Sequence, residues 1–93
     1  MKIIQSGLFE RKVKRLNDRQ KAQLDDAIRN ILRNPSSGEQ KKGDLKMVFI
    51  YKFHIDRTLY LLAYTYTPES LKLIMLGPHE NYYSELKRYL KRR

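Results

Sequence analysis

The sequence contains no cysteine and no run of about 18 apolar residues. The absence of cysteine excludes a disulfide framework and thiolate chemistry, and it is typical of proteins in a reducing compartment. Without a long apolar run there is no candidate for a membrane-spanning helix, and we expect no membrane partner. The first residues, MKIIQSGLFERKVKRL, carry charges too early for the apolar part of a signal peptide. We therefore expect a cytoplasmic protein.

Negative charge is also scarce. Ten Asp and Glu face 20 Lys and Arg, which leaves a net charge of +10 on 93 residues. The chain is long enough for one modest core, and at 41% hydrophobic residues it is expected to fold as a single domain spanning residues 1–93. Such an excess of positive charge costs self-repulsion unless a polyanion or an acidic protein uses it. A merely soluble surface is the alternative, and we favour the charged partner.

The pattern of apolar residues predicts an α+β domain. Residues 1–5 read as a short strand, and two helices follow at about residues 8–16 and 18–34, where Asp18 is the expected N-cap and Pro35 ends the second helix. The tract PSSGEQKKGD reads as a loop. Three strands joined by tight turns come next, and helical spacing then returns; their residues are 45–55, 58–66 and 71–77, with the helix from 79 onward. The predicted order is β-α-α-β-β-β-α, with the N-terminal strand and helical hairpin packed on a small antiparallel sheet and a C-terminal helix.

The strand at residues 45–55 is expected to have one apolar and one cationic face, because side chains alternate along a strand. The apolar face is the natural core side and consists of Met47, Phe49, Tyr51, Phe53 and Ile55. The other face consists of Lys46, Val48, Ile50, Lys52 and His54. Because we expect the helices to cover one face of the sheet, this second set should line the open face.

A group of cations borders the predicted sheet and is a candidate contact for nucleic acid. Cations on a loop and its adjoining strand suit a phosphate backbone, which supplies most sequence-independent affinity for nucleic acid. Lysines also protect edge strands from pairing, so the pattern alone is weak evidence. The group consists of Lys41, Lys42, Lys46, Lys52 and Arg57.

The two histidines are the candidate acid and base. His54 lies near the end of one strand and His79 at the end of another, two strands later. Alternate strands of a meander run the same way, so the two imidazoles should stand across the intervening strand, roughly 10 Å apart. An imidazole with an ordinary pKa near ~6.5 serves as acid or base at neutral pH. A satisfied surface histidine is the alternative interpretation for each.

The stretch LGPHENYY combines a chain break with polar and aromatic groups. His79 follows Gly77-Pro78 and is expected to open the last helix, whose positive end favours a neutral imidazole. Tyr83, four residues on, should share its helix face. The alternative is that both adjacent tyrosines belong to the buried stripe; since they lie ~100° apart, we expect Tyr82 to pack inside and Tyr83 to turn toward His79. With no cysteine and no ligand-type spacing of the histidines, we expect no metal site and no cofactor.

These residues resemble the RelE/ParE superfamily of toxins from bacterial toxin–antitoxin pairs. The resemblance covers nearly the whole chain and is carried by FERKVKRL before the second helix, by GDLKMVFIYKFHIDRTLYLLAY, and by LGPHENYYSELKRYL. Within the RelE branch the sequence is similar to the histidine-using YafQ-like members. It matches their pattern at His54-Ile55-Asp56, at Leu61-Leu62-Ala63-Tyr64, and at Gly77, His79 and Tyr83.

The resemblance implies a ribosome-dependent endoribonuclease that cleaves mRNA in the A site without a metal, inhibits translation, and is neutralised by an acidic antitoxin. It implies that His54 and His79 are the acid/base pair, Asp56 an orienting carboxylate and Tyr83 a contact to the A-site nucleotide, with Lys52 and Arg57 stabilising charge on the phosphate. The ParE branch implies instead an inhibitor of DNA gyrase without nuclease activity. A basic RNA- or DNA-binding module without toxicity is the third interpretation.

Overall fold

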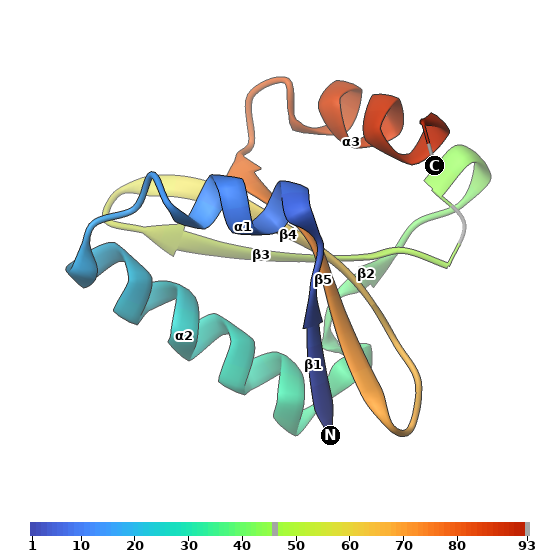
Figure 1. Cartoon of the computed structure of the whole chain (residues 1–93), viewed down its shortest axis with the longest axis horizontal. Coiled ribbons are helices and arrows are strands. Elements are labelled where there is room, and N and C mark those ends of the chain that lie inside the picture. Colours follow the sequence, from blue (N-terminus) through green and yellow to red (C-terminus); the bar gives the residue numbers. More distant parts are fainter. Residues whose placement is uncertain (46, 93) are drawn as a thin grey trace.

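The computed structural model describes residues 1–45 and 47–92, which form one sheet and three α-helices (Figure 1). The predicted order of elements is confirmed, with one strand added. The elements in chain order are β1 (Lys2–Gln5), α1 (Gly7–Val13), α2 (Asp18–Arg33), a 3-10 turn (Pro35–Ser37), β2 (Glu39–Gln40), a second 3-10 turn (Gly43–Leu45), β3 (Phe49–Ile55), β4 (Thr58–Tyr66), β5 (Ser70–Pro78) and α3 (Tyr82–Lys91). The tract predicted as a loop thus contains β2 and two short turns. No described helix meets the length and apolarity that a membrane span requires.

The sheet has the order β1-β5-β4-β3-β2. The pairs β2–β3, β3–β4 and β4–β5 are antiparallel, and tight turns join β3 to β4 and β4 to β5. β1 differs, because it runs parallel to β5, with Lys2 opposite Ser70 and Gln5 opposite Leu73. The two helices of the hairpin follow β1 and carry the chain away from it, so its partner comes from the last strand rather than the next one.

Two apolar cores lie on opposite faces of this sheet, which corrects the prediction that one face stays open. On one face, α1 and α2 cover Phe49, Tyr51, Phe53 and Ile55, as predicted for β3. On the other face, α3 covers a second core that is completed by Leu8 of α1. Figure 1 shows α2 and α3 on opposite sides of the strands. The members of the second core include Val48, Ile50, Leu61, Ala63, Met75, Tyr82 and Leu86. The C-terminal helix α3 therefore leaves only part of this second face of the sheet uncovered.

Local contacts explain where the helices begin. Ser6 caps α1 by accepting a hydrogen bond from the Phe9 N–H, and its hydroxyl donates to the carbonyl of Ile74 in β5. Asn17, not Asp18, is the N-cap of α2, because its side chain forms a capping box with Gln20. The hydroxyl of Ser6 thus fixes α1 against β5, the strand that ends directly before His79.

Two sequence predictions, one about a helix boundary and one about the core face of a strand, are wrong. β5 runs through Pro78 and α3 begins only at Tyr82, so His79 lies in the connection and not in the first helical turn. Met47 has a positive φ of 73° and is 63% exposed, so it is not part of the core face. Lys46 lies outside the residues that the structure describes.

Candidate functional site

The register of the sheet brings the two histidines into one row. His54 of β3 stands opposite Leu59 of β4, and the N–H of His79 donates to the carbonyl of the same Leu59 at 3.0 Å. β3 and β5 are both antiparallel to β4 and so run in the same direction, as predicted. Two strand spacings of ~4.8 Å separate the histidine backbones by roughly 10 Å. Neither histidine is buried, and His54 also borders a shallow hollow between α2 and β3.

The next row explains why the histidine row stays outside the core. Lys52 pairs with Leu61, and Leu61 pairs with Gly77. Gly77 has no side chain, and a Cβ there would lie 3.5 Å from the ring of Tyr82, so the first turn of α3 packs directly over this position. α3 runs from here over the following rows of the sheet, while Lys52 and the histidine row remain accessible. This end of the face is the candidate site.

The adjacent tyrosines divide between the core and the site, as predicted. Tyr82 is 1% exposed, and its hydroxyl donates to the carbonyl of Met75 at 2.6 Å. Burial raises the pKa of Tyr82 far above its ordinary value, so the phenol stays a neutral donor. Tyr83 is half-buried, and its ring meets the ring of His79 edge to face, with centroids 6.5 Å apart and an interplanar angle of 89°. Tyr83 and His79 therefore meet although only Tyr83 is helical.

Lys41 occupies one side of the Tyr83 ring. Its Nζ lies 5.0 Å from the ring centroid, a cation–π contact, and 3.0 Å from a carboxylate oxygen of Glu39. The hydrogen bond with Glu39 raises the pKa of Lys41, and the Tyr83 hydroxyl adds to this effect. The pKa of Glu39 is lowered by the same hydrogen bond, with a smaller contribution from the charge of Lys52. Ammonium, carboxylate and phenol thus form one connected group beside His79.

Asp56 faces α2 in its observed contacts. Its carboxylate accepts hydrogen bonds from Gln20 and Gln23, each at 3.2 Å, and pairs with Arg19 at 3.2 Å. Its own N–H donates to the side chain of Gln23 at 2.8 Å. These contacts lower its pKa, chiefly through Gln23 and then Gln20. With a φ of 55°, Asp56 turns the chain between β3 and β4 and holds that turn against α2.

The remaining predicted cations spread along the edge of the site. Lys52 lies beside the histidine row, Arg57 is exposed in the β3–β4 turn, and Lys42 lines an exposed hollow with Met47 at the other end of β3. Lys46 lies outside the described residues. The structure therefore groups Lys41 and Lys52 with the histidines and Tyr83, and leaves Lys42 and Arg57 at the two ends of β3.

Sequence reasoning missed two features of this surface. Glu39 was taken as part of a loop, and nothing in its spacing shows that β2 sets it beside Lys41. The second is a basic hollow between α1 and α3, where the four-residue spacing of Arg88 and Arg92 was a readable signal of one shared helix face. Among the described residues, no group of three His, Cys, Asp or Glu side chains is arranged to hold a metal ion.

Comparison with known proteins identifies relatives by sequence pattern and by fold. A family model described as the ParE-like toxin of type II bacterial toxin-antitoxin systems matches residues 3–87. No curated protein matches the chain in a sequence search.

Solved structures of toxins share the fold. A YoeB/ParE toxin from Agrobacterium tumefaciens superposes with a TM-score of 0.68 at 23% identity, over 85% of this chain and 99% of its own. The intact E. coli RelBE toxin–antitoxin complex gives 0.67 at 17% identity, over 85% and 96%. YafQ from E. coli gives 0.64 at 19% identity, over 87% and 96%. At these identities the likeness shows the fold alone.

Proposed function

The chain belongs to the ParE-like toxins of type II bacterial toxin–antitoxin systems, within the RelE/ParE superfamily, and on that premise we propose that it is an endoribonuclease that cleaves mRNA in the ribosomal A site. The observation that carries the proposal is the row in which His54 and His79 flank Leu59 on an accessible part of the sheet. A gyrase inhibitor needs no such pair, whereas cleavage of RNA needs one acid and one base.

The proposed reaction uses the two imidazoles in complementary protonation states. One neutral imidazole removes the proton of a 2′-hydroxyl, and the resulting oxygen attacks the adjacent phosphorus. The bond from phosphorus to the leaving 5′-oxygen breaks, and the other imidazole, protonated, donates its proton to that oxygen. A gap of roughly 10 Å between the histidine backbones leaves room for one phosphodiester and the two side chains.

The cations and Tyr83 have supporting roles in this proposal. Lys52, beside the histidine row, and Arg57, in the turn after His54, stabilise the negative charge that develops on the phosphate. Tyr83 offers a ring on which the base of the A-site nucleotide stacks, after that base displaces the ammonium of Lys41. Lys41 then becomes a phosphate contact, together with Lys42 and Lys46 along the flanking RNA.

Asp56 is assigned two roles. Its contacts with Gln23 and Gln20 hold the β3–β4 turn, and therefore the strand end that carries His54, against α2. That it also orients His54 during the reaction stays a prediction. The proposed partners are the ribosome with its mRNA, and an acidic antitoxin that covers the basic surface. The proposed place of action is the cytoplasm, where translation occurs.

The two histidines provide the test. His54→Ala and His79→Ala are expressed beside the parent, and growth arrest is measured together with primer extension on a translated message, with and without ribosomes. We expect the parent to arrest growth and cleave only the translated message, and each variant to lose both effects. As a matched control, Asp25→Ala changes an exposed polar residue of α2 that does not line the hollow at His54, and it should behave as the parent. If neither histidine change relieves arrest and cleavage, the catalytic proposal fails.

The description of the matching family favours one second candidate. A ParE-like toxin without nuclease activity would inhibit DNA gyrase and would need neither histidine. A supercoiling assay with the purified protein decides between the two: inhibition of gyrase with intact mRNA supports the second candidate and excludes the first.

A further inference from the structure

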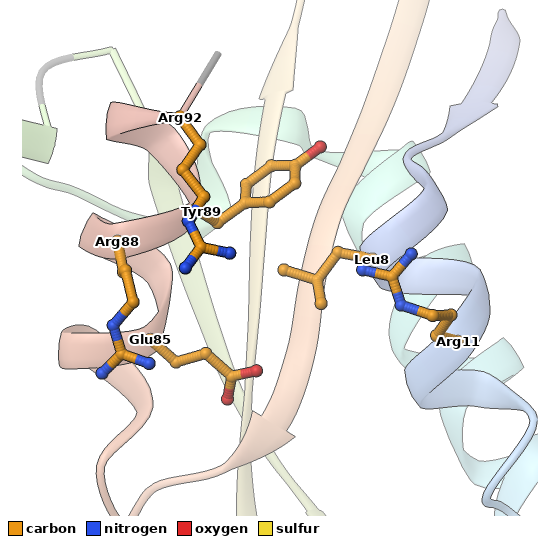
Figure 2. A pocket seen from close by; sticks show the side chains of 6 residues that line it. All are labelled: Leu8, Arg11, Glu85, Arg88, Tyr89 and Arg92. Atoms are coloured by element: carbon orange, nitrogen blue, oxygen red, sulfur yellow. The ribbon is translucent and has the colours of Figure 1, made fainter.

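A second basic hollow lies between α1 and α3, apart from the histidine row. Figure 2 shows side chains from both helices around it, with the ring of Tyr89 and the carboxylate of Glu85 projecting from α3 toward α1. Three of its six lining residues are arginines. The lining consists of Leu8, Arg11, Glu85, Arg88, Tyr89 and Arg92.

The charges of this hollow are not balanced within the described part of the chain. Its one carboxylate, Glu85, pairs with Lys12 of α1, whose Nζ lies 2.7 Å away. None of the ion pairs among residues 1–45 and 47–92 involves Arg11, Arg88 or Arg92. Like charges four residues apart on a helix destabilise it, and Arg11 adds a third from the facing helix. An anionic ligand offsets this repulsion.

The hollow lies close to the candidate RNA site, because both adjoin α3. At ~1.5 Å and ~100° per residue, Arg88 lies about 7.5 Å beyond Tyr83 along the helix axis and about 140° around it. An RNA strand bound at the histidine row therefore reaches the arginines by passing around α3.

The lining favours RNA over an acidic peptide. Guanidinium groups bind phosphate oxygens through paired hydrogen bonds, and several of them around one hollow suit successive phosphates. Tyr89 adds an aromatic ring, which in nucleic-acid sites stacks on a base irrespective of sequence. A peptide carboxylate uses the arginines equally well, but it brings no base to stack on the ring of Tyr89.

We propose that the hollow between α1 and α3 is a distal phosphate subsite that binds the RNA backbone a few nucleotides from the cleaved bond. The proposal rests on the proposed function for its substrate, but its test measures binding and needs no cleavage. Arg88 and Arg92 hold the phosphates from α3, Arg11 closes the hollow from α1, and Tyr89 supports a base.

The experiment compares two double variants on the same helix. Arg88→Gln with Arg92→Gln removes two charges from the hollow, and Lys87→Gln with Lys91→Gln removes two exposed charges that do not line it. Binding is measured by fluorescence anisotropy with a labelled, fully 2′-O-methylated RNA of about 12 nucleotides, and with one of about 4 nucleotides. The blocked 2′-hydroxyl prevents cleavage, so binding is read even if the protein is no nuclease.

For the longer RNA, the arginine pair should lower affinity at least tenfold and reduce the slope of log affinity against log salt by about 1.4, at ~0.7 per phosphate. The lysine double variant should change the affinity and the salt slope less than half as much as the arginine double variant does. The short RNA should bind the two variants equally well. Equal losses for both pairs would mean a general charge effect and would overturn the subsite. Unchanged RNA binding by the arginine pair, with lost binding of the purified cognate antitoxin, would overturn it in favour of a protein-docking site. Loss of cleavage in His54→Ala and His79→Ala tests the proposed function separately.

Discussion

The two adjacent tyrosines allow a test of how the last helix joins core and site. Tyr82→Phe removes one hydroxyl that is fully enclosed and donates to the carbonyl of Met75 at 2.6 Å. The ring remains, so no cavity forms, but the carbonyl loses a buried donor. Such a loss costs about 1–2 kcal/mol. For a domain of this size, each kcal/mol shifts the midpoint of thermal unfolding by roughly 4–8 °C, so we expect a decrease of roughly 5–15 °C.

Tyr83→Phe is the matched change one residue later. Its side chain is only half-buried, so we expect a change in stability within about 0.5 kcal/mol. Both variants are unfolded with urea and followed by far-ultraviolet circular dichroism. In the cleavage assay the pattern should reverse: well below its unfolding midpoint Tyr82→Phe should act as the parent, whereas Tyr83→Ala should lose activity because the stacking ring is gone.

The comparison has a clear adverse outcome. If Tyr83→Phe lost as much stability as Tyr82→Phe, or if Tyr82→Phe unfolded at the urea concentration of the parent, the division of the two rings between core and site would be wrong. An unchanged slope of free energy against urea is the control that both variants unfold from the same compact state.

Three further predictions concern the frame around the site. Gly38→Ala should destabilise the protein by about 2–3 kcal/mol, since a Cβ would lie 2.6 Å from a buried tyrosine hydroxyl, while Gly7→Ala, with its nearest contact at 3.7 Å, should not; urea unfolding measures both. The carboxyl of Asp56 has a lowered pKa when folded, so its contribution to stability is present above about pH 4 and is lost as the pH falls through the folded pKa. An acid titration of unfolding should therefore be less steep for Asp56→Asn. Glu39→Gln should raise affinity for 2′-O-methylated RNA in the parent but not in Lys41→Met, and an equal gain in both would show that Glu39 does not act through Lys41.

Much of the architecture follows from periodicity in the sequence. The spacing of apolar residues predicted both hairpin helices, and the alternation along β3 correctly separated Phe49, Tyr51 and Phe53 from Lys52 and His54. These patterns are local and depend only on repeat lengths. The parallel pairing of β1 with β5 was not predicted, because it joins residues 68 positions apart, such as Lys2 and Ser70, and no local pattern records which distant edge a strand meets.

Part of the candidate site also follows from local patterns. A meander of tight turns makes β3 and β5 run in the same direction, so the row of two histidines was predicted from the topology. The covering of the opposite face by α3 was missed, because the apolar side chains Val48 and Ile50 were read as part of a cationic face. The contacts of Asp56 with Gln20 and Gln23 depend on side-chain geometry across two elements, which spacing along the chain does not contain.

The parallel pairing of β1 with β5 also affects when the sheet that carries the histidine row is completed during synthesis. β1 has no strand partner until Leu73 has been made, and the histidine row is incomplete until His79 follows it. Contacts of such high sequence separation form late, because most of the chain must be available before they close. A nascent chain with both helices and β3 in place therefore still lacks the histidine row. The order of the strands delays the assembly of the candidate site until nearly all of the described chain has been translated.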